Sequence, residues 1–236
     1  MRRGLVWNYN EVKYLKGKEI QQQAMKIVRN GLADGIMILL SHPPVYTIGR
    51  GGGYENLKKN VDEIKKIAEI YEVERGGNIT FHGPGQLVIY PILNLRKWPT
   101  DIGQLAYNLE EIIIKVLKDY NIIGERIPHS KYRGVWVEDK KICAMGLSID
   151  HFITWHGLAF NVNTDLSYFE NIVPCGIREY GVTSLEKLGI KEDIEEVKTK
   201  VIQKTEEIFD IKFTYDRSEN DEECRMVESK YFHRKV

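Results

Sequence analysis

The chain is poor in cysteine, with only Cys143, Cys175 and Cys224 among its 236 residues and no pair at Cys-x-x-Cys spacing. An odd number of thiols without that spacing argues against a disulfide framework and against a structural zinc site. The sequence also lacks a His-Glu-x-x-His motif, so no metal is expected. Unpaired cysteines are typical of a reducing compartment, and we therefore expect a cytoplasmic protein.

Charge of one sign and long apolar runs are missing as well. Basic and acidic residues number 34 each, so the formal net charge is zero and nothing suggests a nucleic-acid-binding protein or a general membrane binder. No segment approaches the roughly 20 apolar residues that span a bilayer, and the N-terminus lacks the apolar run of a signal peptide. With 42% hydrophobic residues, the chain is expected to form one soluble domain around a continuous core.

The spacing of apolar residues predicts an α+β domain in which runs of strands are separated by helices. Pro91 within an apolar run favours an edge strand or a bulge at that point, and Thr100 is the predicted N-cap of the clearest helix. A turn is expected at residues 139–141. We assign residues 1–215 to the domain and residues 216–236 to a charged C-terminal tail without predicted structure. Helices are predicted over residues 11–30, 61–71, 101–117 and 194–209, and strands over 4–9, 35–41, 87–95, 134–138, 142–149, 154–162 and 211–215.

Three short segments carry the chemistry. The first, residues 75–86 (RGGNITFHGPGQ), places four glycines beside an arginine and a histidine, a composition suited to close backbone approach. The second is residues 141–146 (KICAMG), and the third is residues 174–177 (PCGI) followed by 181–185 (GVTSL).

A cysteine is a useful nucleophile only when a cation, a base or a helix N-terminus populates its thiolate. Cys175 lies between Pro174 and Gly176, where a tight turn is expected to present the sulfur, but a small buried hydrophobe is an equally good interpretation from the residues alone. Cys143 lies inside an apolar run and is expected to be buried. Cys224 falls in the tail and is interpreted as incidental.

The other candidates are Lys141, His82 and His156. Composition alone makes Lys141 a solvated turn lysine, and each histidine is more simply explained by a structural hydrogen bond. Beside a cysteine, however, a lysine ammonium stabilises the thiolate and, once deprotonated, accepts a proton from an incoming amine. Because side chains alternate along a strand, Lys140 is expected to point away from any site that contains Lys141.

Together these segments resemble the octanoyltransferase family of lipoate biosynthesis over about residues 43–185. The resemblance implies the fold of the biotin and lipoate protein ligase catalytic domains, a mixed sheet with packed helices. It also implies that Cys175 and Lys141 are catalytic. The substrate-binding residues that it implies are Arg75, Gly76, Gly77, Asn78, Ile79, Thr80, Phe81, His82, Ala144, Met145, Gly146, His156, Gly157, Leu158 and Ala159.

The activity implied by the resemblance is transfer of an octanoyl group from octanoyl-acyl carrier protein, through a thioester on Cys175, to a lysine. That lysine belongs to the lipoyl domain of a 2-oxo acid dehydrogenase or to the glycine-cleavage H protein. No cofactor is needed, because the thioester donor is already activated. Since the chain has no net positive charge, Arg50 and Arg75 are the positions expected to form a local basic rim for the acidic partners; an internal ion pair is the alternative for both arginines.

Three other functions stay open at this point. The first is an ATP-dependent lipoate ligase of the same fold, although no P-loop or Gly-x-Gly-x-x-Gly pattern supports nucleotide binding. The second is a non-catalytic module that binds an acyl chain or a lipoyl domain, for which neither Cys175 nor Lys141 would be needed. The third is a cysteine hydrolase, which would need a well-placed histidine and would be insensitive to loss of Lys141.

Overall fold

The computed structural model describes residues 2–98, 101–129, 132–176 and 180–217, without the side chains of Cys175 and Arg217. Within these ranges no helix is long and apolar enough to cross a bilayer. The strands are β1 (Arg2–Glu11), β2 (Gly35–Ser41), β3 (Val45–Ile48), β4 (Glu69–Glu72), β5 (Ile79–His82), β6 (Gln86–Leu93), β7 (Gly134–Val137), β8 (Lys140–Asp150), β9 (Ile153–Asn161), β10 (Gly181–Val182) and β11 (Ile211–Arg217). The helices are α1 (Tyr14–Arg29), α2 (Val61–Lys65), α3 (Ile102–Asp119) and α4 (Ile194–Phe209), with 3-10 turns η1 (Tyr54–Asn56), η3 (Leu166–Asn171), η4 (Pro174–Gly176) and η5 (Glu186–Leu188).

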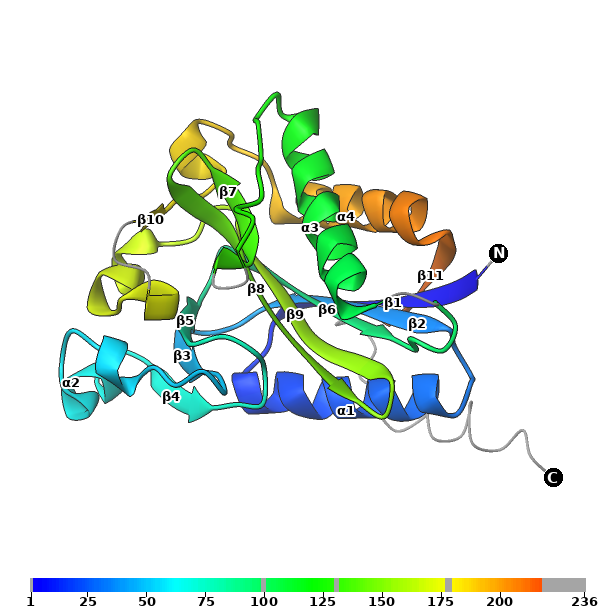
Figure 1. Cartoon of the computed structure of the whole chain (residues 1–236), viewed down its shortest axis with the longest axis horizontal. Coiled ribbons are helices and arrows are strands. Elements are labelled where there is room, and N and C mark those ends of the chain that lie inside the picture. The colour runs from blue at the N-terminus through cyan, green and yellow to red at the C-terminus, as the bar shows by residue number, and fades with distance from the viewer. Residues whose placement is uncertain (1, 99–100, 130–131, 177–179, 218–236) are drawn as a thin grey trace.

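A large mixed sheet forms the centre of the fold, in the order β10-β8-β9-β6-β2-β1-β11, with β7 paired to β8. Helices α3 and α4 cover one face and α1 covers the other, while a small sheet in the order β4-β3-β5 lies beside the N-terminal end of α1 (Figure 1). Pairs β8–β9, β9–β6 and β6–β2 are antiparallel, and β2–β1 and β1–β11 are parallel. The α+β class predicted from the sequence is confirmed.

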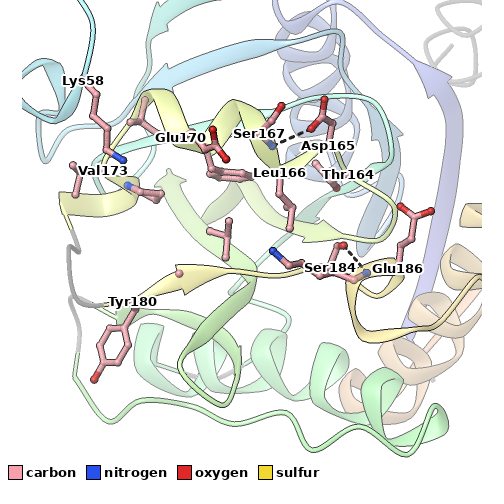
Figure 2. A pocket seen from close by; sticks show the side chains of 16 residues that line it. Lys58, Thr164, Asp165, Leu166, Ser167, Glu170, Val173, Tyr180, Ser184 and Glu186 are labelled. Carbon is pink, nitrogen blue, oxygen red and sulfur yellow. Dashed lines mark hydrogen bonds between the residues drawn. The ribbon is translucent and has the colours of Figure 1, made fainter.

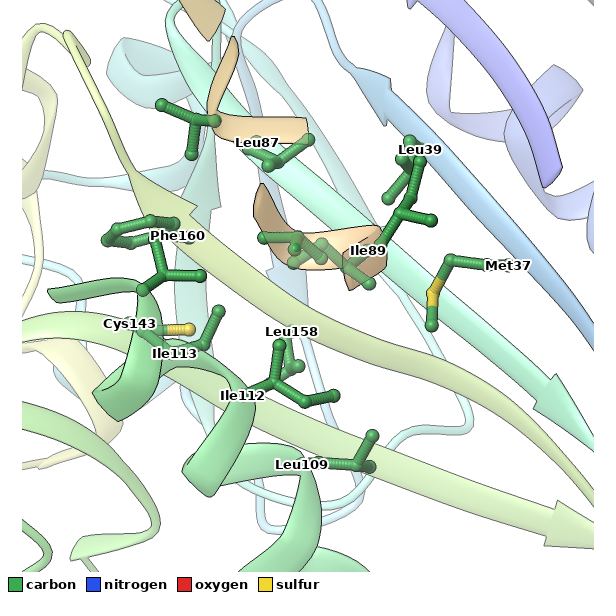
Figure 3. Packing of buried hydrophobic residues seen from close by; sticks show 14 of the residues in the cluster. Met37, Leu39, Leu87, Ile89, Leu109, Ile112, Ile113, Cys143, Leu158 and Phe160 are labelled. Atoms are coloured by element: carbon green, nitrogen blue, oxygen red, sulfur yellow. The ribbon is translucent and has the colours of Figure 1, made fainter. Parts of the chain in front are cut away.

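The largest apolar core lies between the sheet and α3 with α4. Figure 3 shows side chains of α3, among them Ile112 and Ile113, against Cys143 of β8 and Phe160 of β9. All four of these side chains are fully buried. The apolar positions of α3 recur every three or four residues, and this spacing forms the stripe that is buried here.

The structure corrects the helix predicted over residues 61–71. Helix α2 ends at Lys65, and Glu69–Glu72 form β4, which pairs in parallel with β3. Strand β3 was not predicted at all, because it has only four residues and follows two prolines. As long as β3 is not recognised, the sequence gives no reason for residues 69–71 to form a strand. Pairing with a neighbouring strand overrides their local helical pattern.

The edge position predicted for Pro91 is wrong, because β6 lies inside the sheet between β2 and β9. The ladder to β9 does break where the missing N–H would be needed. It runs from Gln86 to Ile89, which pairs with Leu158, and resumes as an isolated bridge between Asn94 and Ile153.

The N-cap of α3 and the turn before β8 also differ from the prediction. The N-cap of α3 is Asp101, whose Oδ1 accepts a hydrogen bond from the Gln104 N–H at 2.7 Å; Thr100 lies outside the described residues. The turn before β8 ends at Asp139, so that Lys140 and Lys141 belong to the strand. The division of the chain at residue 215 stays a prediction, because residues 218–236 lie outside the described ranges.

Candidate active site

Small residues of β8 and β9 form the floor of a narrow cavity on the face of the sheet opposite α3. Ala144 pairs with Ala159, and Gly146 pairs with Gly157. A Cβ on Gly146 would lie 2.8 Å from the carbonyl oxygen of Gly76 and 3.0 Å from Cδ of Arg75. Glycine is therefore required where the opposite wall comes this close.

The opposite wall comes from β5 and from the segment that precedes it. Arg75, Gly77, Thr80 and His82 line the cavity there. Arg75 is only 7% exposed, and its guanidinium donates to the carbonyl oxygen of Thr47 at 2.7 Å and to the carbonyl oxygen of Gly76 at 2.9 Å. The place expected for Arg75 on a basic surface rim is therefore wrong. Its charge lies inside the cavity wall, whereas Arg50 is exposed.

Four of the predicted substrate-binding residues do not line the cavity. Ile79 and Phe81 are buried in the core of the small sheet, because successive side chains of β5 point to opposite faces and only Thr80 and His82 face the cavity. The Asn78 amide donates to the carbonyl oxygen of Gly51 at 3.0 Å and holds the glycine loop. The backbone N–H of Gly76 donates to the carbonyl oxygen of Leu147 at 2.9 Å, so this residue joins the wall to β8.

Three lining residues were missed by the sequence analysis: Tyr14, Val88 and Tyr90. Tyr14 is the first residue of α1, and no local motif marks it. Val88 and Tyr90 are two apart on β6, so the alternation of that strand was the one available signal that they share a face. It would not have identified which face borders the cavity.

His82 lies in a fully buried hydrogen-bond network. Its Nδ1 is 2.8 Å from Oε1 of Gln86, and its Nε2 is 3.3 Å from Oγ1 of Thr47. Burial, with the nearby His42 and Arg75, lowers the pKa of His82 to about 3, so that the ring is neutral at physiological pH. With both ring nitrogens bonded inside the wall, this histidine has a structural role in the present arrangement.

His156 is also buried, at 2% exposed, but it is held differently. Its φ of 56° lies in the left-handed region, which is uncommon for a residue other than glycine. Its backbone N–H donates to Oε1 of Gln21 on α1 at 2.7 Å. Burial and the charge of Arg75 lower the pKa of His156 to about 3, so this ring too is neutral at physiological pH.

A second small cavity, around Lys141, adjoins the first. The two share Thr80, Ala144 and Ala159, and the second is also lined by Pro174. Its volume is about 20 Å³ and that of the first about 30 Å³, each close to the share of one water molecule in the liquid. The two cavities lie one after the other along β8 and β9, beginning at Lys141, and are together called the channel below. The remaining residues of the second cavity are Gln86, Asn161, Phe169 and Val182.

Lys141 is a buried cation. It is 7% exposed, its Nζ donates to the carbonyl oxygen of Arg133 at 3.0 Å, and it lies 4.7 Å from the centroid of the Trp136 ring. A solvated turn lysine would show neither the burial nor these contacts. Lys140 points away from the cavity and forms an exposed ion pair with Asp139 at 3.6 Å, as the alternation predicts.

Cys175 is the middle residue of η4, a turn that packs on η1. The Val173 N–H donates to the carbonyl oxygen of Asn56 at 2.7 Å, and the Gly176 N–H donates to that of Val173 at 3.0 Å. Pro174 reaches the cavity around Lys141, which brings the backbone of Cys175 to the mouth of the channel, although its side chain lies outside the described atoms. Cys143, by contrast, is fully buried in the α3 core, and burial raises the pKa of its thiol. Cys224 is outside the described residues.

A wide groove of about 940 Å³ opens beside Pro174. One wall comes from residues 164–174 and the other from residues 180–187 (Figure 2). Phe169, Pro174 and Val182 line both this groove and the cavity around Lys141. The groove is therefore the large opening nearest to the buried cation among the described residues.

Comparisons with known proteins agree with this architecture. Residues 13–206 match the family model described as the lipoyl protein ligase A/B catalytic domain. The fold is similar to that of a bipartite lipoate protein ligase from Thermoplasma acidophilum, with a TM-score of 0.73 at 18% identity over 92% of this chain and 88% of that chain. It is more distantly similar to the biotin protein ligase of Aquifex aeolicus, with a TM-score of 0.51 at 15% identity over 89% of this chain and 70% of that chain. The fold expected from the resemblance is thus confirmed.

Sequence relatives narrow the choice within this fold. The chain is 58% identical over 215 residues to an octanoyltransferase of Thermoanaerobacter sp. (strain X514), covering 91% of this chain and 93% of that protein. It is 56% identical over 214 residues to the octanoyltransferase of Caldanaerobacter subterraneus subsp. tengcongensis, covering 90% and 93%. The channel of small residues that begins at the buried Lys141 is thus the candidate active site of an enzyme. The chain belongs to the octanoyltransferase family and transfers octanoyl groups in lipoate biosynthesis.

Proposed function

We propose that the octanoyl group passes through a thioester on Cys175, with Lys141 moving the protons. The observation that carries this proposal is the position of Lys141, a buried ammonium in a cavity that Pro174 also lines. A cation beside a cysteine lowers the pKa of the thiol and so populates the nucleophilic thiolate. Cys143 is a poor alternative, because it lies in the apolar core on the other face of the sheet.

In the first half-reaction, the Cys175 thiolate attacks the carbonyl carbon of octanoyl-acyl carrier protein. A new C–S bond forms, the C–S bond to the carrier's phosphopantetheine breaks, and Lys141 gives its proton to the departing thiolate. In the second half-reaction, the amine of an acceptor lysine attacks the enzyme thioester. An amide bond forms, the bond to Cys175 breaks, and neutral Lys141 takes the proton that the amine loses, which restores the starting ion pair.

The acyl chain would lie in the channel between β8–β9 and β5. Alanine and glycine on the floor leave room for methylene groups there, but the channel holds only about 30 Å³ beyond the cavity around Lys141. Octanoyl is larger than this, so a wall must move when it enters.

The wide groove beside Pro174 is the proposed entrance for both partners. Acyl carrier protein would deliver its phosphopantetheine arm along it, and the lysine of a lipoyl domain would follow after the first half-reaction. These domains are those of 2-oxo acid dehydrogenases and the glycine-cleavage H protein. The groove carries charges of both signs, including Lys58 and Lys187 as well as Asp165, Glu170 and Glu186. Neither partner is therefore selected by net charge alone.

The test is intact-protein mass spectrometry of the chain mixed with octanoyl-acyl carrier protein. We expect one octanoyl adduct, mapped by peptide digestion to Cys175 and discharged when a lipoyl domain is added. The Cys175→Ala variant should form no adduct. An adduct on Cys143, or transfer without any adduct under single-turnover conditions, would overturn the proposed mechanism.

A further inference from the structure

One wall of the channel is the side chain of His156, whose backbone and ring are both held in place by neighbouring residues. Among the residues of β8 and β9 that line the channel, His156 is the furthest along the ladder from Lys141. It pairs with Leu147, one position beyond Gly146 and Gly157. The small residues of the floor thus give way to an imidazole at the end of the channel.

The backbone of His156 is fixed by an interruption of the sheet. Ile89 pairs with Leu158, and Asn94 bridges to Ile153, so Pro91 stands opposite His156 where regular pairing is absent. The His156 N–H bonds to Gln21 of α1 instead. This anchor, with a φ of 56°, sets the direction in which the ring leaves the strand.

The ring of His156 is held as well. It packs against Trp155 with the ring centroids 4.3 Å apart, and its Nε2 lies 4.0 Å from Oε2 of Glu74. The other oxygen of Glu74 accepts a hydrogen bond from Lys18 of α1 at 2.7 Å. Neither Nε2 of His156 nor Oε2 of Glu74 has a hydrogen-bond partner among the described residues, and both atoms are buried. An apolar chain that pushed past the ring would be forced against these polar atoms, which is costly.

The distances suit an acyl chain of eight carbons. Extended backbone spans about 3.3–3.6 Å for every three bonds, so the seven bonds from the carbonyl carbon of octanoyl to its methyl group span about 8 Å. The step from the Ala144–Ala159 pair, where the two cavities meet, to the Leu147–His156 pair is three residues, or about 10 Å along the strand. Two further carbons would reach the imidazole.

We propose that His156 is the end wall of the acyl channel and that its side chain sets the upper limit of acyl-chain length. This rests on the proposed function, since it takes the carbonyl group to lie at the Ala144–Ala159 pair, where the cavity around Lys141 meets the rest of the channel. The wall formed by the segment before β5 then widens the channel when the chain enters. The wall at His156 limits its length.

The test uses competition between donors. Octanoyl, decanoyl and dodecanoyl thioesters of acyl carrier protein are mixed in equal amounts with the protein, and the adducts are counted by intact-protein mass spectrometry. The parent protein should carry octanoyl almost alone. His156→Gly removes the ring and suits the left-handed backbone, so the ratio of decanoyl to octanoyl adduct should rise about tenfold or more, the scale on which a pocket discriminates between chain lengths.

His151→Gly is the matched control. It is also a histidine at positive φ in the same hairpin, but it is exposed and does not line the channel, so it should keep the ratio of the parent. His156→Asn tolerates the same backbone and should shift the ratio less than glycine but in the same direction; it also serves if the glycine variant does not fold.

The outcomes separate this inference from the proposed function. The role of His156 as end wall would be wrong if the parent protein accepted octanoyl, decanoyl and dodecanoyl donors equally well. It would also be wrong if a His156 variant transferred octanoyl with an unchanged ratio of decanoyl to octanoyl adduct. Either result would leave the thioester mechanism intact. If all three adducts fell by the same factor in a His156 variant, His156 would only support the fold, and its role as end wall would again be wrong. Absence of every adduct on the parent protein would remove the mechanism and the end wall together.

Discussion

The two faces of the β8–β9 hairpin are made by the same strands and have opposite character. Toward α3, Cys143, Leu158 and Phe160 lie in a buried apolar core (Figure 3). Toward β5, alanine and glycine leave a channel that ends in polar side chains. The difference arises because successive side chains of a strand point to opposite faces. The large apolar side chains on one face stabilise the fold, and the small side chains on the other face leave space for a substrate.

The same alternation places Lys141 in the cavity and Lys140 outside it. Substitution of Lys141 is the change for which we expect the largest effect. Lys141→Met keeps the length of the side chain but removes its ammonium, so transfer should fall by about 10²- to 10⁴-fold, the usual contribution of a positioned proton-transfer group. The pH profile for alkylation of Cys175 by iodoacetamide should also shift upward, because the thiolate loses its cation.

Lys140→Met is the control for this prediction. Its exposed side chain pairs with Asp139 outside the cavity, so both the transfer rate and the alkylation profile should match those of the parent. An alkylation profile that is unchanged in Lys141→Met would remove Lys141 from the activation of the nucleophile.

The comparison of the faces is tested directly by neighbouring residues on β8. Ala144 lines both small cavities, so Ala144→Leu should block the channel and lower octanoyl transfer by more than tenfold, given that overpacking costs about 1–3 kcal/mol. Cys143→Ala should lower the free energy of unfolding by about 1 kcal/mol, since it removes one buried atom, and leave the transfer rate unchanged. Urea unfolding and a single-turnover transfer assay measure the two effects. Loss of transfer in Cys143→Ala would mean that the faces are not independent.

How far the sequence alone predicts this site depends on whether a residue acts locally or through a distant neighbour. Strand β2 and helix α4 were predicted with the observed bounds, because an unbroken apolar run and a regular stripe are local signals. Residues 69–71 were wrongly predicted as helix, because β3, the strand with which they pair, was not recognised in the sequence. The alternation that sends Thr80 and His82 to the channel and Phe81 to a core was readable only after β5 was recognised as a strand.

Residues from elements distant in sequence could not be predicted in the same way. Tyr14 lines the channel because α1 crosses beneath it, and Gln21 holds His156 across 135 positions of the chain. Neither residue stands in a motif. Arg75 was identified as important, but its burial depends on Thr47 of the unpredicted strand β3. The segments that carry the chemistry could thus be identified from the sequence, whereas the residues that orient them could be identified only from the folded structure.

The smallest predicted effect concerns acid, and it again distinguishes the two faces. His42, His82 and His156 all lie on the side of the sheet away from α3, and burial lowers their pKa values to about 4, 3 and 3. In the unfolded chain a histidine has a pKa of about 6.5. As the pH falls below that value, the unfolded state binds protons that the folded state does not, so stability is complete above about pH 6.5 and is lost progressively below it.

Urea unfolding at pH 7.0 and pH 5.5 measures this loss. His82→Gln keeps an amide in place of the ring and cannot titrate, so its free energy of unfolding should fall less between the two values, by up to about 1.4 kcal/mol per pH unit for one histidine. If His82→Gln kept the parent's slope, His82 would take up its proton in the folded state. The channel face of the sheet would then admit water at His82, unlike the apolar core on the α3 face.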